Sequence, residues 1–458
     1  MNITLAIAPG FVRKKPLLGV AYLAAALRGR GHAVEVADLN IESALPDEDE
    51  GARWWDKDYV DNYLDANPGF LDSLCRRLAA TKPDVLGFSA WHLNQPFTMA
   101  LARHMRENYG PLFILMGGPD ADSFFMCRHA DAYVTGEGEH ALIKIAELLP
   151  DKAALAAIPG VSMRLDGRLL KGGEALELPD LDALPLPDFS GFPLESYKHK
   201  KTLPISFNRG CRNCCAFCCM SSVWKKFRTR RPDAIYAEFV RDAEVYGADN
   251  LQVDCAAFNL DMQAVEGLCD RLIAWGREVR WSGMGLIRPD LEERMADKLA
   301  KAGCSRIDFG FESGSDHVLA LMRKPFNAAM AEKVVRACAG AGIEVVLSII
   351  LGFPGENDED VENTKRFLER NKRYITDLGV PNECGVGGGS PIDREPLRFG
   401  IRPESVTSCL GWETVDGSLT HVTRQKRVEE FCQWRLNAGF GEQKEKSIKL
   451  IGENYSRE

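Results

Sequence analysis

The chain has 458 residues, 45% hydrophobic and 27% charged, which is enough for about two to four domains with their own cores. A net charge of −9 argues against the clustered basic surface that grips phosphate backbones, so we expect no nucleic-acid partner. No apolar run approaches the roughly 20 residues of a membrane helix, and the first residues lack the pattern of a signal peptide. We therefore expect a cytoplasmic protein with no membrane partner.

Strand and helix patterns alternate through the first 150 residues. Apolar strand patterns lie at 2–8, 32–40, 83–91, 112–118 and 131–138, and helical patterns separate most of them. This alternation predicts an α/β domain at 1–150 with a doubly wound parallel sheet of about five strands. Ligands bind such sheets outside the carboxyl ends of the strands.

The turns at those strand ends are rich in glycine, which lets a backbone approach a large flat ligand closely. The same residues also suit ordinary tight turns. No G-x-G-x-x-G follows the first strand, so a dinucleotide fingerprint is absent. A long segment at 42–68 is predicted to be a loop that places Trp54 and Trp55 as a flap over this edge. The candidate ligand contacts are Pro9, Gly10, Trp91, His92, Leu93, Asn94, Gly117, Gly118, Pro119, Gly136, Glu137 and Gly138.

A second domain is predicted after a hairpin and a proline-rich linker at 151–199. Helices and strands alternate again over 200–378, which predicts a partial (β/α)6 barrel with its reactive loops at the carboxyl ends of the strands. The remaining segment, 379–458, ends in an amphipathic helical pattern and is predicted to form a small, mostly helical cap or substrate region.

Five of the 14 cysteines fall within nine residues after the first strand of this second domain. We expect reduced thiols, because disulfides are disfavoured in the cytoplasm. Cys211, Cys215 and Cys218 can hold three irons of a [4Fe–4S] cluster and leave the fourth iron open for chemistry. Zinc is the alternative, but it prefers four ligands. Cys214 and Cys219 remain open as spare ligands, a redox pair or packing residues.

The array Arg209-Gly210-Cys211-x3-Cys215-x-Phe217-Cys218 resembles the signature of the radical S-adenosylmethionine (SAM) enzymes. The segments 309–313, 352–356 and 280–291 are similar to that family's SAM-contacting segments, and the domain order resembles its cobalamin-dependent (class B or BchE-like) branch. The resemblance covers about residues 1–375 and implies a [4Fe–4S] cluster, SAM and cobalamin as cofactors. It implies SAM contacts from Phe217, Asp254, Arg288, Glu312, Ser313, Gly352 and Pro354, and cobalamin contacts from the glycine-rich edge of the first domain.

Two departures from the family pattern change individual assignments. Asp254 stands where the family has a Gly-Gly-Glu segment for the SAM amino group. The first strand ends in Ala-Pro-Gly-Phe instead of leading to D-x-H-x-x-G, so we expect no lower axial histidine from that turn, and His92 stays a lesser candidate. Glu312 ends an apolar strand and needs a partner when buried, either a ligand or a barrel arginine.

The resemblance implies a methyltransferase that acts on an unactivated carbon of a small molecule, through a 5′-deoxyadenosyl radical and methylcobalamin. It also implies an external electron donor such as flavodoxin or ferredoxin. One alternative keeps the cofactors but catalyses oxidative cyclisation or ring rearrangement without methyl transfer. Another makes the first domain a degenerate protein-interaction module and the barrel independent of cobalamin.

Overall fold

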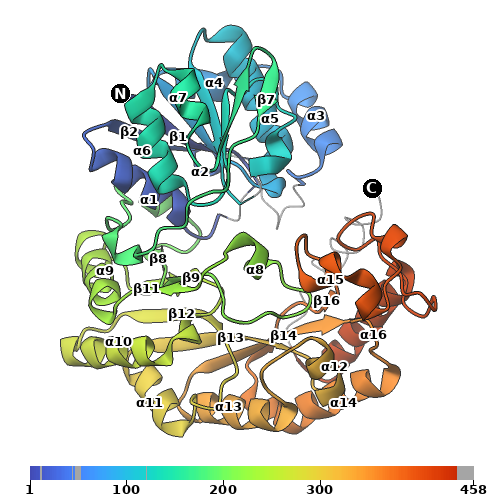
Figure 1. Ribbon diagram of the computed structural model, residues 1–458. Coiled ribbons are helices and arrows are strands. Elements are labelled where there is room, and N and C mark those ends of the chain that lie inside the picture. The colour runs from blue at the N-terminus through green and yellow to red at the C-terminus, as the bar shows by residue number, and fades with distance from the viewer. Residues whose placement is uncertain (11–12, 44, 47–52, 120, 441–458) are drawn as a thin grey trace. The chain divides into compact units, whose positions relative to one another are not determined.

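The computed structural model describes residues 1–10, 13–43, 45–46, 53–119 and 121–440. The chain forms two compact units, Met1–Pro204 and Ile205–Glu458, and the boundary between them falls inside strand β8. Both units are α/β, as expected for a parallel-sheet domain followed by a partial barrel (Figure 1). Among the described residues, none of the helices has the length and apolar character needed to cross a membrane.

The first unit is built on a seven-stranded sheet with the order β2-β1-β3-β4-β5-β6-β7. Strands β1 to β5 pair in parallel, and the hairpin of β6 and β7 extends the sheet in antiparallel fashion. The bounds are β1 Asn2–Ile7, β2 Ala33–Asp38, β3 Val85–Ser89, β4 Phe113–Gly117, β5 Ala132–Val134, β6 Val161–Leu165 and β7 Arg168–Leu170. The apolar runs form central strands because both of their faces are covered by helices.

Helices cover the two faces of this sheet (Figure 1). Helices α1 and α6 pack against each other, and α5 packs against α3 and α4. The bounds are α1 Leu18–Arg28, α2 Leu39–Glu42, α3 Lys57–Ala66, α4 Phe70–Ala79, α5 Gln95–Asn108, α6 Gly138–Leu148 and α7 Lys152–Ala156.

The predicted flap at 42–68 is wrong for Trp54. Helix α3 occupies part of the segment that the sequence assigned to a loop. The Trp54 side chain lies in the core, 3% exposed, with edge-to-face contacts to Tyr59, Tyr63 and Phe97. Its indole nitrogen donates to the carbonyl of Pro46 at 3.1 Å. Trp54 therefore closes the core under α3 instead of covering a ligand.

The second unit holds a sheet with the order β15-β14-β13-β12-β11-β8, of which β11 to β15 pair in parallel. The bounds are β8 Thr202–Ile205, β11 Asn250–Val253, β12 Arg280–Gly285, β13 Cys304–Glu312, β14 Glu344–Leu351 and β15 Asp377–Leu378. Helices α9, α10, α11, α13 and α14 follow one another along its outer face, and α12 lies outside this row (Figure 1). They run α9 Pro232–Val245, α10 Met262–Trp275, α11 Glu293–Lys301, α12 Asp316–Leu321, α13 Ala328–Gly340 and α14 Asp358–Asn371.

Short elements complete the second unit. A two-stranded ribbon of β9 and β10 precedes α9, and β16 pairs with β14. The predicted C-terminal helix is present as α16, which packs against β14 and β16. The bounds are β9 Asn208–Arg209, β10 Arg228–Thr229, β16 Asn382–Glu383, α8 Met220–Val223, α15 Pro391–Arg394 and α16 His421–Asn437.

Candidate active site

The cysteine-rich segment is a loop whose ends are joined by the β9–β10 ribbon. Gly210 opens the loop with a φ of 85°, and a Cβ there would lie 2.6 Å from the carbonyl oxygen of Lys226. Only glycine fits this left-handed and crowded position. The fold thus closes the loop before its cysteines begin.

Backbone amides inside the loop point at two of the three predicted ligands. The amide of Asn213 donates to Cys211 Sγ at 3.4 Å, and the amide of Met220 donates to Cys218 Sγ at 3.5 Å. Hydrogen bonds of this kind stabilise a thiolate and tune the potential of an iron–sulfur cluster. Cys214 is exposed to solvent.

Burial raises the pKa of the Cys211, Cys215 and Cys218 thiols, and each of the three also feels the charge of another thiol in the set. The ammonium group of Lys324 acts on all three in the opposite direction and lowers their pKa. Within the described residues, no three His, Cys, Asp or Glu side chains converge on one point where a single metal ion would bind. The donor set, three partly buried thiols with amide donors and a cation, fits a cluster with several irons.

Lys324 is a functional candidate that sequence reasoning missed. Its Nζ donates to Glu312 Oε1 at 3.0 Å and to the carbonyl of Gly310 at 2.9 Å. The same Nζ lies 5.4 Å from the centroid of the Phe217 ring. The side chains of Lys324 and Glu312 are only 5% and 9% exposed, so this is a buried ion pair. Glu312 therefore has a barrel cation as its partner, but a lysine in place of the expected arginine.

The backbone brings this ion pair to the cysteine loop. The amide of Ala216 donates to the carbonyl of Met322 at 3.0 Å, which ties the loop to the segment that carries Lys324. Glu312 has a φ of 67° at a register shift of β13, an uncommon backbone state for a residue with a side chain. Such strain, of order 1–3 kcal/mol, clusters at functional sites.

Three further predicted SAM contacts lie in the loops after β13 and β14. The hydroxyl of buried Ser313 is 3.1 Å from Thr364 Oγ1. Gly352 has a φ of 72°, and its amide donates to Glu356 Oε2 at 2.6 Å. Pro354 lines a cleft of about 970 Å³ in the same unit. The structure thus brings Ser313 and Gly352 to the carboxyl edge of the sheet that also carries Glu312.

Arg288 and Asp254 lie on other strand ends. Arg288 makes two hydrogen bonds to Asp290, at 2.8 and 2.7 Å, and one to the carbonyl of Leu260 at 3.2 Å. A ligand carboxylate would have to compete with Asp290 for this guanidinium. Asp254 is an exposed residue directly after β11, and its amide donates to the carbonyl of Ile205 at 2.7 Å.

The predicted cobalamin contacts all lie at the ends of β1, β3, β4 and β5, on one edge of the first sheet. Two glycines there are required by the protein itself. A Cβ on Gly10 would lie 2.4 Å from the carbonyl oxygen of Leu93, and a Cβ on Gly118 would lie 2.4 Å from that of Ala90. Their φ values are 132° and 146°. These glycines let neighbouring loops pack backbone against backbone.

Several side chains at this edge also hold the loops. Buried Asn94 accepts from the amide of Trp91 at 2.9 Å and donates to the carbonyl of Ser89 at 2.8 Å. Buried Glu137 accepts from the amide of Leu178 at 2.6 Å. His92 lies in a short turn with its ring against that of Trp91, 5.3 Å between centroids. Pro9, Gly117, Pro119, Gly136 and Gly138 complete the edge.

Comparisons with known proteins agree with these two units. The B12 binding domain family matches residues 14–146, and the Radical SAM superfamily matches residues 205–368. An uncharacterized methyltransferase of Pyrococcus horikoshii is 24% identical over 367 residues, 78% of this chain and 73% of the relative. The cytidylyl-2-hydroxyethylphosphonate methyltransferase of Streptomyces wedmorensis is 24% identical over 84% of this chain and 78% of its own.

Solved structures show the same fold. The cobalamin-dependent SAM radical enzyme OxsB with aqua-cobalamin bound superposes with a TM-score of 0.71 at 16% identity, over 94% of this chain and 66% of OxsB. The radical SAM methyltransferase TsrM of Kitasatospora setae, with tryptophan substrate and a SAM analog bound, superposes with a TM-score of 0.66 at 16% identity, over 93% and 82% of the two chains. The chain therefore combines a B12 binding domain with a Radical SAM superfamily domain, the domain pair of a cobalamin-dependent radical SAM enzyme.

Proposed function

We propose that the protein is a methyltransferase that places a methyl group on an unactivated carbon of a small molecule. The observation that carries the proposal is the group of three thiols, Cys211, Cys215 and Cys218, with Lys324 beside them, in a chain that also carries a B12 binding domain. The methyltransferase names of the two relatives support transfer of a methyl group. When bound, the cluster, SAM and cobalamin supply the radical and the methyl group.

The chain's own residues would prepare the cluster site in three ways. The three thiolates bind iron, and the amides of Asn213 and Met220 donate to two of the sulfurs. Lys324 offsets the negative charge that the thiolates add, which favours the reduced cluster. Cys214, which is exposed, is left outside the ligand set.

SAM would lie against the edge formed by the loops after β11, β12, β13 and β14. Glu312 would accept hydrogen bonds from SAM, and Phe217 would cover one side of SAM. Both residues contact Lys324, so they lie on the same part of this edge. Arg288 would exchange Asp290 for the carboxylate of SAM, and Asp254 would take the amino group. Ser313, Gly352 and Pro354 would line the same edge.

Cobalamin would lie on the glycine-rich edge of the first unit, without a histidine ligand from the first loop. The electron paramagnetic resonance spectrum of the Co(II) form should then lack superhyperfine splitting from a nitrogen ligand. His92→Ala is the control, and it should leave the spectrum unchanged. Nitrogen splitting that disappears in His92→Ala would contradict this assignment.

The function is tested by anaerobic incubation of the reconstituted protein with SAM, cobalamin, candidate substrates and a reductant. Flavodoxin or ferredoxin should replace the chemical reductant, because we propose an external donor of this class. Mass spectrometry should find a product heavier by one CH2 group. A product lighter by two hydrogen atoms would instead indicate oxidative cyclisation and overturn the methyltransferase assignment.

A matched pair of variants shows whether the product depends on the cluster. Simultaneous replacement of Cys211, Cys215 and Cys218 by alanine should abolish both product and 5′-deoxyadenosine. Cys214→Ala should retain both.

A further inference from the structure

The barrel unit contains a cleft of about 970 Å³ whose walls come from five parts of the chain. These are the end of α12, the loop from β14 to α14, the segments 398–400 and 414–419, and α16. Its volume is in the range of about 300–1,000 Å³ that is typical of small-molecule sites. Leu321, Pro354, Phe399 and Leu419 supply apolar surface.

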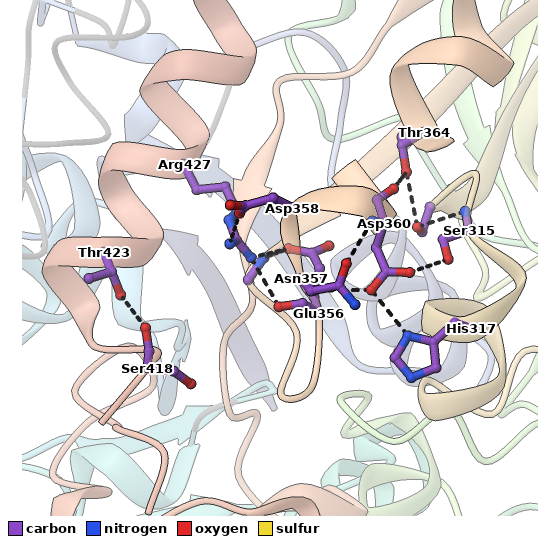
Figure 2. Close-up of polar contacts among 12 residues, drawn as sticks. Ser315, His317, Glu356, Asn357, Asp358, Asp360, Thr364, Ser418, Thr423 and Arg427 are labelled. Carbon is purple, nitrogen blue, oxygen red and sulfur yellow. Dashed lines mark hydrogen bonds and ion pairs between the residues drawn. The ribbon is translucent and has the colours of Figure 1, made fainter. Parts of the chain in front are cut away.

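The acidic side chains of the cleft are satisfied by their neighbours. Arg427 donates to Glu356 Oε2 at 3.0 Å and to Asp358 Oδ1 at 2.8 Å, and Figure 2 draws both contacts. Asp416 accepts from the amide and the hydroxyl of Ser418, at 3.0 and 2.8 Å. Arg427 therefore already pairs with carboxylates of the protein, so it is not the residue that would bind an anionic ligand. These carboxylates already have partners, so the cleft does not favour a cationic ligand.

Arg323 is different, because this exposed side chain has no acidic partner within the part of the chain that the structure describes. Its guanidinium carbon lies 5.3 Å from the centroid of the Phe399 ring. A guanidinium stacked in this way keeps its N–H edges free for a carboxylate or phosphate, which it can bind with two parallel hydrogen bonds.

The backbone at Arg323 is also unusual. The amide of Lys324 donates to the carbonyl of Leu319, and that of Arg323 to the carbonyl of Ala320, which is the hydrogen-bond pattern of a Schellman motif after α12. Arg323 has a φ of 58° at the position where glycine is most common. The chain thus carries a charged side chain at a position whose backbone conformation favours glycine.

We propose that this cleft binds a planar organic acid, whose carboxylate or phosphate pairs with Arg323 and whose ring lies against Phe399. The apolar wall of Leu321 and Leu419 holds the rest of the molecule. This site goes beyond the proposed methyl transfer. The cleft shares Pro354 with the predicted SAM contacts, but Arg323, Phe399, Leu321 and Leu419 are not among the predicted cluster, SAM or cobalamin contacts.

The test uses 8-anilinonaphthalene-1-sulfonate, a fluorescent aromatic anion, added to the anaerobically purified full chain. Indole-3-acetate should displace part of the bound dye, whereas neutral indole-3-acetamide should not. Arg323→Gly removes the charge and relieves the backbone, so the variant should fold and hold iron normally. Its affinity for indole-3-acetate should be lower by about tenfold or more, the loss expected for a charge-assisted hydrogen bond.

Three controls make the result decisive. Phe399→Leu should weaken binding of the aromatic acid, and Arg402→Gln, outside the cleft, should not. Unchanged affinity in Arg323→Gly, or equal competition by the acetamide, would overturn the proposal. If inorganic phosphate displaced the dye as well as indole-3-acetate did, the site would recognise an anion alone and the assignment of an organic acid would be wrong. Dye binding needs no turnover, so failure here is distinct from failure of the methyltransferase assay.

Discussion

Replacing Lys324 by methionine should destabilise the barrel unit far more than a comparable change at the surface. Lys324 and Glu312 are 5% and 9% exposed, so the variant leaves Glu312 as a buried carboxylate without its partner. Breaking a buried pair from one side costs about 3–5 kcal/mol. Lys298 is the matched control, because it pairs with Glu266 but both side chains are far more exposed, 22% and 34%. Lys298→Met should cost about 0–1 kcal/mol.

The double variant Lys324→Met with Glu312→Gln measures the coupling free energy between the two side chains, apart from their contacts with other residues. Its loss of stability should be smaller than the sum of the two single losses, because both charges are removed together. The measurement is urea unfolding of cluster-free protein, followed by hydrogen exchange of peptides from 205–440. If the two losses were simply additive, Lys324 and Glu312 would not be coupled and the ion pair could not organise the site.

Three further predictions follow from single features. The brown chromophore of anaerobically purified protein should survive Cys214→Ala and be lost when Cys211, Cys215 and Cys218 are all replaced by alanine. Absorbance and iron content measure it. Burial raises the pKa of Glu356 from 4.5 to about 7, so the folded state binds the Glu356 proton more tightly than the unfolded state does. The free energy of unfolding of the wild type should therefore fall as the pH rises from 4.5 to 7. Glu356→Gln should remove about 3 kcal/mol of that pH dependence in urea titrations, and equal slopes for both proteins would contradict the assignment. Gly118→Ala should lower the melting temperature of the cobalamin-binding unit, because its Cβ meets the Ala90 carbonyl, whereas Gly117→Ala, whose nearest contact is 3.5 Å, should be tolerated.

The fold could be predicted because its signals are local and repeated. Apolar runs followed by helical patterns recur along both units, and the parallel sheets follow from that order. The prediction of a flap at 42–68 was wrong for the same reason, because the local sequence there is acidic and shows no regular pattern. Tyr59 and Tyr63 lie one helical turn apart on α3, and their contacts with Trp54 were the apolar stripe that a helix there required.

The site was predictable where one short segment carries the chemistry, as in the cysteine loop. Lys324 could not be predicted in the same way, because it reaches Glu312 across α12, twelve residues along the chain. The need of a buried carboxylate for a cation was the available signal, but it did not say which cation. Arg288 shows the reverse case, since Asp290, two residues away, already occupies its guanidinium.

Arg424 links α16 to the loop after β14. It is fully buried, donates to the carbonyls of Leu410 and Trp412, and pairs with Glu383. Its side chain packs so closely on Gly352 that a Cβ on that glycine would lie 2.6 Å from Arg424 Cγ. The Radical SAM superfamily match ends at residue 368, yet a fragment cut there would lose the side chain that packs on Gly352. We therefore expect a fragment that ends at residue 368 to be less stable than one that extends through α16.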